Sequence, residues 1–525
     1  MTEGLKLADL IREQRRRLGS IRRLAERLGV TDKTVQDWMK KDEDELRRLR
    51  PDHIDKILEV AQDLQLEPER FSIGPPLWDP KDSYDENLAW VPPPAPRPAR
   101  PFLNHAIEFL GRRVNSPIGV SPSPLTATAA RITFFADQGA DIITYKTVRS
   151  REARAHRPPN MYFCAADLPM LSPPVLSNSE VVVSDSYRRD LARYGVVNSF
   201  GCPSVTPEAW QADFRVAQQS ARPGQLIILS VTGWRGDNPS ERAAVDDWVR
   251  VLELAASAGA RVIEIDLSYP TVPEASANLF HDSALVAKIC KLQQRIDASV
   301  KILLKIGYLV GEELSTLVLR TAGAGLCHGF SAISALPVRA VHLGPDGAEP
   351  AFGTPRIGVG LAGRPILTLG LQCVHELALI RDREGLKEMA IVGMGGITTE
   401  QDFLAYLHSG ANIVQVTSAC FFDSYFPYKL RKFYDAQVRR SVGLLEEEQD
   451  IALANFAKAS RSLEQELGAS PDNAEPIMAA AQNEMVQWLR RKDHATSLGP
   501  LRPRPAPTMD ECKRLIQSRL VRAAT

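Results

Sequence analysis

The chain has 525 residues, which is too many for one ordinary hydrophobic core, so we expect two or more domains. Hydrophobic residues make up 44% of the chain and charged residues 24%, as in soluble globular proteins. The formal net charge is zero, which excludes a global attraction to nucleic acid or anionic membranes and leaves only a local basic patch to supply one.

Residues 1–73 are predicted to form an all-α domain. Within it, the stretch IRRLAERLGVTDKTVQDWMKK (21–41) has Ala25, Gly29 and Val35 where two crossing helices need a small residue, a turn glycine and a branched apolar residue. This pattern resembles the helix-turn-helix of the Cro/repressor family. The resemblance implies a recognition helix over about 32–40, whose candidate DNA contacts are Lys33, Thr34 and Gln36.

Some features of the local charge favour DNA binding and others oppose it. Residues 11–41 hold ten Lys or Arg against four Asp or Glu, a basic face suited to DNA phosphates. However, Asp32 and Asp37 lie on or beside the expected recognition helix, and residues 1–72 balance to zero charge. A helix-turn-helix kept for dimerisation or docking is therefore the alternative to DNA binding.

Residues 74–101, GPPLWDPKDSYDENLAWVPPPAPRPARP, are predicted to be an extended linker, because their prolines interrupt any helix or central strand. At the other end of the chain, residues 437–525 predict a helical C-terminal extension that is broken by GPLRPRPAPT.

Residues 102–436 alternate short β-branched or apolar runs with longer helical patterns. The predicted strands cover residues 117–121, 141–145, 226–230, 262–267, 301–306, 329–333, 389–393 and 412–416. Eight strands separated by helices in about 330 residues predict an α/β fold, the parallel (β/α)8 TIM barrel. The alternative, a doubly wound open sheet, lacks a Gly-x-Gly-x-x-Gly after its first strand.

The functional residues of such a barrel lie at the C-terminal ends of its strands. Gly395 and Gly396 follow the seventh strand, and Thr417 and Ser418 follow the eighth. Both loops are expected to offer backbone N–H groups, the first at the start of a helix, and so to form a phosphate site. Other polar side chains at strand ends are Ser121, Lys146, Thr147, Ser230, Asp266, Ser268, Tyr269, Lys305 and Ser334.

Several motifs in residues 102–430 together resemble the dihydroorotate dehydrogenases and the flavin domain of dihydropyrimidine dehydrogenase. They are NSPIGVSPS (115–123), ITYKTVRSREARAHRPP (143–159), VVNSFGCPS (196–204), LIILSVTG (226–233), LLKIG (303–307), GLAG (360–363), IVGMGGITTEQD (391–402) and VQVTSA (414–419). The resemblance implies a barrel that binds FMN and orients a substrate for hydride transfer.

The resemblance also implies roles for individual residues. The expected FMN-binding residues are Ser121, Lys146, Thr147, Asn198, Ser230, Lys305, Ser334, Gly363, Gly395, Gly396, Thr417 and Ser418. The expected substrate-binding residues are Asn198, Gly201, Ser268 and Thr271. The expected catalytic residues are Tyr269, Lys146 and Asp266.

The loop after the fourth strand departs from the family, which has Asn-x-Ser-(Cys or Ser)-Pro-Asn where this chain has DLSYPT (266–271). Tyr269 stands at the position of the catalytic base, and Asp266 and Thr271 replace two substrate asparagines. After the sixth strand, Ser334 replaces a third. Losing three planar amides disfavours orotate as the substrate. A tyrosine is a proton donor at neutral pH; the alternative is that Tyr269 only plugs a degenerate pocket.

We therefore expect an FMN-dependent oxidoreductase acting on the CH–CH or C=C bond of a pyrimidine-like small molecule other than orotate. One alternative is a flavin- or ligand-responsive DNA-binding regulator with a degenerate barrel, and another is a scaffold without a redox role. The seven scattered cysteines lack zinc and iron–sulfur spacings, so no metal is expected and the electron partner is not named. No apolar run or signal-like start appears, so we expect a cytoplasmic homo-oligomer without a membrane segment.

Overall fold

The computed structural model describes residues 7–41, 53, 56–57, 60, 77–90, 102, 105, 107–165, 179–184, 194–233, 241–268, 278–345, 347–356, 358–467 and 507–524. The chain divides into two compact units, Met1–Arg431 and Lys432–Thr525. Among the described helices, none is both long and apolar enough to cross a membrane.

The N-terminal helices are α1 (Leu7–Leu18), α2 (Ile21–Leu28) and α3 (Asp32–Lys40). Side-chain caps at Ser20 and Thr31 begin α2 and α3, and Gly29 ends α2 with a left-handed φ of 66°. The helices enclose a small apolar core that includes Leu24, Val35 and Trp38. The helix expected over 32–40 coincides with α3, while its role in DNA binding stays a prediction.

Residues 77–90 differ from the extended linker expected over 74–101. They contain a helix, α6 (Tyr84–Ala89), which begins with a capping box between Ser83 and Glu86. The buried Arg131 of the barrel donates to the carbonyls of Leu77, at 3.5 Å, and Asn87, at 2.5 Å. Residues 80–90 contain a single proline, Pro80. The local sequence therefore permits this helix, although residues 74–101 as a whole are rich in proline.

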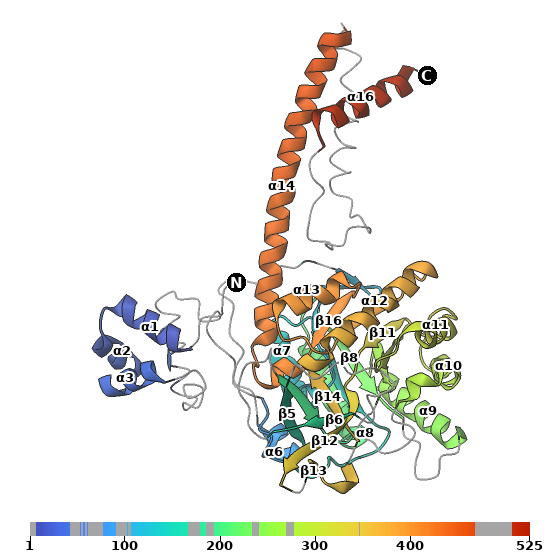
Figure 1. Ribbon diagram of the computed structural model, residues 1–525. Coiled ribbons are helices and arrows are strands. Elements are labelled where there is room, and N and C mark those ends of the chain that lie inside the picture. The colour runs from blue at the N-terminus through green and yellow to red at the C-terminus, as the bar shows by residue number, and fades with distance from the viewer. Residues whose placement is uncertain are drawn as a thin grey trace. The chain divides into compact units, whose positions relative to one another are not determined.

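The predicted (β/α)8 barrel is confirmed, with a strand at each of the eight expected places (Figure 1). Its parallel strands, in spatial order, are β3 (Ile118–Val120), β4 (Ile142–Val148), β8 (Leu226–Val231), β9 (Val262–Asp266), β10 (Lys301–Ile306), β11 (Gly329–Ala332), β15 (Ala390–Met394) and β16 (Ile413–Val416). β16 pairs with β3, which closes the barrel.

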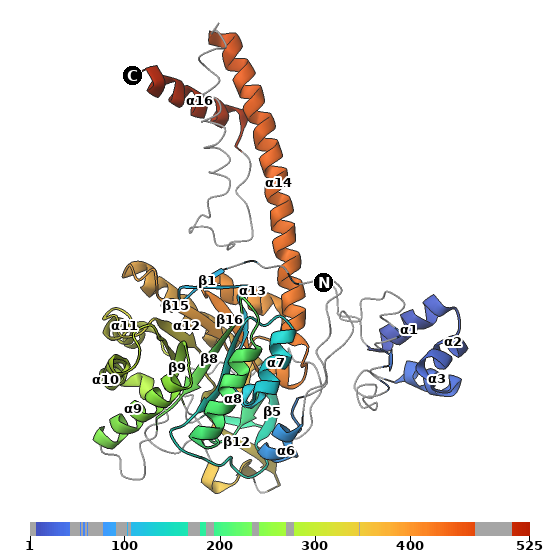
Figure 2. The ribbon, with the colours of Figure 1, turned by 180° about the vertical axis from the view of Figure 1, so that it is seen from behind.

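Helices surround the strands in both views of the barrel (Figure 2). They are α7 (Ala129–Asp137), α8 (Pro207–Ser220), α9 (Glu241–Ser257), α10 (Ser283–Lys291), α11 (Gly311–Arg320), α12 (Leu367–Arg383) and α13 (Glu400–His408). Helix α8 illustrates why they pack there: Trp210, Phe214 and Ala217 recur at helical spacing and are fully buried.

A second sheet, which the sequence analysis did not predict, lies in the insertions after β4 and β11. Its order is β13-β12-β14-β7-β5, with β6 paired to β12. The strands are β5 (Met161–Ala165), β6 (Glu180–Val182), β7 (Tyr194–Asn198), β12 (Leu336–Gly344), β13 (Gly347–Pro350) and β14 (Gly358–Gly363). Pairing of β7 with β14 places Asn198 opposite Gly360, at the end of β7 that leads into the pocket described below.

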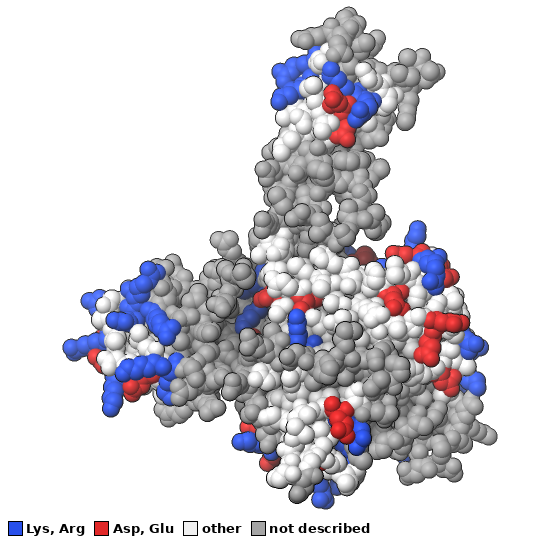
Figure 3. All heavy atoms as spheres, in the orientation of Figure 1, with Lys and Arg blue, Asp and Glu red and all other residues white. Residues whose placement is uncertain are grey.

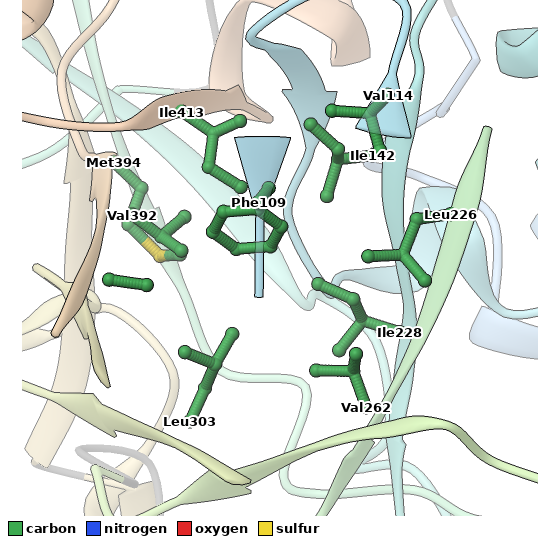
Figure 4. Close-up of a cluster of buried hydrophobic side chains, with 11 residues drawn as sticks. Phe109, Val114, Ile142, Leu226, Ile228, Val262, Leu303, Val392, Met394 and Ile413 are labelled. Carbon is green, nitrogen blue, oxygen red and sulfur yellow. The ribbon is translucent and has the colours of Figure 1, made fainter. Parts of the chain in front are cut away.

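A β-hairpin, β1 (Ile107–Phe109) and β2 (Arg112–Val114), packs against the barrel interior. Its turn residues Leu110 and Gly111 both have positive φ, as a two-residue hairpin turn requires. The ring of Phe109 is 2% exposed and lies among inward-facing strand residues such as Ile142, Leu303 and Ile413 (Figure 4). These starts of the strands carry apolar side chains, so the polar chemistry gathers at the opposite ends.

The C-terminal unit contains most of a long helix, α14 (Phe426–Leu467), and a shorter one, α16 (Met509–Ala524). Ala452, Phe456 and Ala459 of α14 are buried, as are Cys512 and Ile516 of α16. Most of α14 and all of α16 fall within residues 437–525, and the bounds of the expected helical extension stay a prediction. Because α14 is continuous from residue 426, no break in secondary structure marks the expected boundary at 436–437.

Candidate active site

A pocket lies at the C-terminal ends of the barrel strands and gathers most of the residues expected to form the site. The expected residues that line it are Ser121, Lys146, Thr147, Asn198, Gly201, Asp266, Ser268, Lys305, Ser334, Gly395, Gly396, Thr417 and Ser418. These residues come from seven of the eight strands or the loops that follow them, and from the loop after β7. Residues between Ser121 and Ser418 in the sequence are therefore brought together at one end of the barrel.

Lys146 and Thr147 are consecutive, yet both line the pocket. Regular strand alternation would turn one of them away. The pairing of β4 with β8 shifts by one residue between Tyr145 and Val148, which is a β-bulge at this position. A bulge re-aims side chains, so the two neighbours can face the same space. Burial lowers the pKa of Lys146, and the nearby positive charge of Lys305 lowers it further.

Lys305 and Asp266 form a buried ion pair on neighbouring strands. Lys305 Nζ donates to Asp266 Oδ2 at 2.8 Å, and the hydroxyl of Thr147 donates to the same oxygen at 3.1 Å. Burial by itself would lower the pKa of Lys305, but the carboxylates of Asp266 and Glu264 outweigh burial and raise that pKa above its ordinary value. Lys305 is therefore fixed in position as a cation.

Glu264 is a buried acid that the sequence analysis missed. It lies two residues before Asp266 on β9, and its Oε1 accepts a hydrogen bond from Ser230 Oγ at 2.9 Å. Burial raises the pKa of Glu264, although the charge of Lys305 opposes this shift. Strand alternation gives Glu264 and Asp266 the same inward face, so the spacing in VIEID was the signal that could have identified it.

The two loops expected to bind phosphate lie on one side of the pocket. Gly395 and Gly396 have positive φ values of 107° and 78°, and a Cβ atom at Gly396 would lie 2.5 Å from the backbone of Leu367. Only glycine fits this close approach. In the second loop, the hydroxyl of Thr417 is hydrogen-bonded to that of Ser121.

The start of the helix after Gly396 is partly capped from within the chain. The helix after Gly396 was expected to begin with free N–H groups, but Asp402 Oδ2 accepts those of Thr398 and Thr399 at 3.0 and 2.9 Å. Thr399 and Asp402 form a capping box for α13. The N–H groups of Thr398 and Thr399 are therefore already used, and the expected phosphate site at the glycine and Thr417-Ser418 loops stays a prediction.

On the side of the pocket expected to hold substrate, some polar groups do not use their full hydrogen-bonding capacity among the described residues. The Asn198 amide nitrogen donates to the Gly360 carbonyl at 3.2 Å. The Ser268 hydroxyl is buried and has no hydrogen-bond partner among the described residues. A buried polar group without a partner is costly, so Ser268 is suited to bind a polar atom of a ligand.

An aromatic wall closes another side of the pocket. Phe200 and Phe421 line it and are stacked, with ring planes 8° apart and centroids at 6.5 Å. Trp78, from the segment before the barrel, packs edge-on against both rings, with centroids at 5.2 and 5.9 Å. The 77–90 segment thus supports the pocket wall, a contact that the linker prediction did not include.

Four expected residues stand apart from the rest. Ser230 is fully buried beneath the pocket, where it bonds Thr147 and Glu264, and does not line it. Gly363 also does not line the pocket, although the preceding Ala362 does. Tyr269 and Thr271 lie outside the described residues, so their expected roles stay predictions.

The described residues fit the chemistry of FMN. The phosphate end of this cofactor needs backbone donors in a close-fitting loop, and Gly395 and Gly396 line the pocket with a loop of this kind. The flavin end of the cofactor has both polar and apolar atoms. The pocket is lined by the charged Lys305 and by the apolar Ile333 and Met394.

Comparison with known proteins agrees with this geometry. The dihydroorotate dehydrogenase family model matches residues 188–430. A dihydroorotate dehydrogenase from Dictyostelium discoideum is 27% identical over 368 residues, which cover 68% of this chain and 97% of that relative. A dihydroorotate dehydrogenase A (fumarate) from Limosilactobacillus reuteri is 26% identical over 34% of this chain and 54% of its own length. The catalytic subunit of a dihydroorotate dehydrogenase B (NAD(+)) from Alkaliphilus oremlandii is 26% identical over 43% of this chain and 67% of its own length. The barrel of this chain is thus similar to the dihydroorotate dehydrogenase family, oxidoreductases that act on CH–CH donors and typically use FMN.

Proposed function

We propose that the barrel binds FMN and that the protein oxidises or reduces the CH–CH or C=C bond of a pyrimidine-like ring other than orotate. The observation that carries this proposal is a contrast within one pocket. Two lysines and the loops proposed to bind phosphate line it, whereas Asp266 and Ser334 stand where the resemblance implies substrate amides.

The chain's own residues divide into two groups in this proposal. Gly395, Gly396, Thr417 and Ser418 hold the phosphate, and Lys305 faces the flavin. When bound, FMN supplies the acceptor or donor of a hydride.

The second group holds the ring of the substrate. Asn198, Ser268 and Ser334 offer hydrogen bonds to it, and Lys146 orients it at the end of β4. The walls made by Phe200 and Phe421 limit the access of water, which strengthens these polar contacts. Tyr269 is proposed to give or take the proton that accompanies hydride transfer.

The experiment is an anaerobic substrate panel with the full-length protein. Dihydrouracil, dihydrothymine and dihydroorotate are mixed with the oxidised protein, and uracil, thymine and orotate with the reduced protein, while flavin absorbance is followed. We expect at least one uncharged ring to change the flavin's oxidation state faster than dihydroorotate or orotate does. A protein that reacts best with the orotate pair, or with no member of the panel, would contradict the proposed function.

A second function, DNA binding by the N-terminal helices, is favoured by a specific observation. Lys33 and Gln36 are exposed on α3, and Thr34 is half-buried beside them. Figure 3 shows mainly Lys and Arg side chains on the visible face of helices α1–α3. We propose that α3 is a recognition helix and that the protein also binds duplex DNA.

The test compares binding of the full chain to genomic DNA fragments at increasing salt. We expect binding at low salt that weakens steeply, because phosphate contacts release counterions. Replacing Lys33 and Gln36 together by alanine should abolish selection of particular fragments, whereas Lys387→Ala on the barrel surface should not. Failure of the full chain to bind any fragment at low salt would leave the helices a docking role.

A further inference from the structure

Asp266 uses both of its carboxylate oxygens inside the protein. Oδ2 accepts hydrogen bonds from Lys305 Nζ at 2.8 Å and from Thr147 Oγ1 at 3.1 Å. Oδ1 accepts the backbone N–H of Ser268 at 3.2 Å. The residue is only 2% exposed. Its carboxylate is therefore fixed in one orientation and committed to Lys305 rather than open to a ligand.

The ion pair between Asp266 and Lys305 lowers the net positive charge that a ligand meets in the pocket. Among the described residues that line the pocket, the Lys, Arg, Asp and Glu side chains are Lys146, Lys305 and Asp266. With all three ionised they sum to one positive charge. An asparagine at 266, the residue of the family motif, would leave two. In a buried site such a difference acts strongly, because little water screens it.

An asparagine could not replace the aspartate in this network. Its amide oxygen could accept one of the two hydrogen bonds that converge on Oδ2, but it carries no charge to balance Lys305. Glu264, whose pKa burial raises, would remain as an acidic neighbour of Lys305, so a ligand carboxylate or the cofactor could supply the missing negative charge. With aspartate in place, that charge is already supplied.

We propose that Asp266 is a specificity-determining residue, which cancels the charge of Lys305 and so makes the pocket select an uncharged ring over a ring that carries a carboxylate. This inference rests on the proposed function and names the substrate class for the same pocket. Asp266 acts through Lys305, so it is a positioning residue. Thr147 and the Ser268 backbone hold its carboxylate against that lysine.

The negative charge of Asp266 should also affect the reduction potential of bound FMN. Reducing a flavin adds negative charge to it, and a lysine whose charge is balanced stabilises that charge less. The reduction midpoint potential of the holoprotein should therefore be lower than it would be with asparagine at this position.

The test compares the full-length parent with Asp266→Asn by calorimetric titration with orotate and with uracil. We expect the variant to bind orotate at least about tenfold more tightly relative to uracil. Asp297→Asn removes an exposed carboxylate that does not line the pocket, so it should keep the parent ratio. Asp266→Glu, which keeps the charge, should also keep it.

The second readout is the midpoint potential of the FMN-loaded proteins. Asp266→Asn should raise it by about 30 mV or more, which is a tenfold change in the equilibrium constant of a two-electron couple. An orotate-to-uracil ratio that is equal in parent and Asp266→Asn overturns the inference. So does an equal shift of the ratio with Asp297→Asn, or an Asp266→Asn variant that binds no orotate. If the parent binds no FMN, the proposed function fails, but the ratio measured on the purified chain still decides the role of Asp266.

Discussion

The indole of Trp78 packs edge-on against the phenyl ring of Phe200, with ring centroids 5.2 Å apart and planes at 78°. Leu77 strengthens this contact, because its N–H donates to the carbonyl of Phe421 at 3.0 Å. Both phenylalanines line the candidate active site. The segment that precedes the barrel in sequence is thus in direct contact with the wall of its pocket.

This contact predicts that Trp78 reports on the occupancy of the pocket. A ligand that displaces Phe200 or Phe421 changes the surroundings of the indole, so tryptophan emission should change when FMN or a substrate binds. Trp78→Phe should remove most of the change that substrate causes, whereas Trp248→Phe, in the buried face of α9, should leave it intact. A response that survives in Trp78→Phe and vanishes in Trp248→Phe would place the sensitive indole elsewhere.

A buried ion pair at the starts of the strands predicts a large effect on stability. Arg431 donates to Asp141, which also accepts from Ser116 Oγ at 2.6 Å, and Arg431 is 2% exposed. Removing one partner leaves an uncompensated buried charge, so Arg431→Met should lower the free energy of unfolding by about 3–5 kcal/mol. Urea denaturation followed by circular dichroism measures this change.

The control for that prediction is Arg383→Met. Arg383 is an exposed arginine paired with Glu384, and such pairs contribute about 0–1 kcal/mol. The double variant Asp141→Leu with Arg431→Met removes both charges and should recover most of the loss. A double variant that is less stable than Arg431→Met alone would show that hydrogen bonds, rather than charge balance, dominate at this pair.

Glu264 predicts a pH dependence of stability. Its pKa in the folded protein is raised by burial above the ordinary value of 4.5. As pH rises past that value, the unfolded chain releases the proton while the folded protein keeps it, so this residue lowers the free energy of unfolding. Glu264→Gln cannot ionise and keeps an acceptor for Ser230. Its stability relative to the parent should therefore increase from about pH 5 upward, as urea unfolding at several pH values would show. A difference that is constant with pH would contradict the raised pKa.

The barrel could be predicted from the sequence because its strands are fully buried and stand out as short apolar runs between helices. Their polar ends were identified for the same reason, since Lys146, Asp266 and Lys305 each interrupt or follow such a run. The second sheet escaped prediction because several of its strands, such as β13 and β6, are short and exposed and lack a clear apolar pattern. Its strands also pair with segments more than 100 residues away.

The connections among side chains could not be predicted from spacing alone. The bulge that turns both Lys146 and Thr147 toward the pocket depends on pairing with β8. The capping of α13 by Asp402 removes donors that its glycine-rich start suggested were free. Similarly, Trp78 lies in a proline-rich segment, and only its contacts with Phe200 and Phe421 show that it packs behind the pocket wall.

A further prediction is that Tyr269 donates a proton during the reaction. A tyrosine at the family's catalytic position is a poor base at neutral pH but a ready donor. We expect Tyr269 to protonate the carbon next to the one that would accept a hydride from bound FMN. Tyr269→Phe keeps the bulk of the ring and removes the proton, so substrate should reoxidise the reduced variant about 10²-fold or more slowly. Stopped-flow absorbance measures this rate, and an unchanged rate would make the tyrosine a packing residue.

The FMN content of the purified chain tests the central claim most directly, because every proposed role of the pocket depends on it. The half-buried Ser418 provides a matched pair of variants: Ser418→Asp places a carboxylate beside the proposed phosphate position, and Ser418→Asn has nearly the same size without the charge. After reconstitution with FMN and gel filtration, we expect about one FMN per chain in the parent. Most of it should be retained in Ser418→Asn, and little in Ser418→Asp. A parent that retains no FMN, or a Ser418→Asp variant that retains as much as Ser418→Asn, would contradict the account.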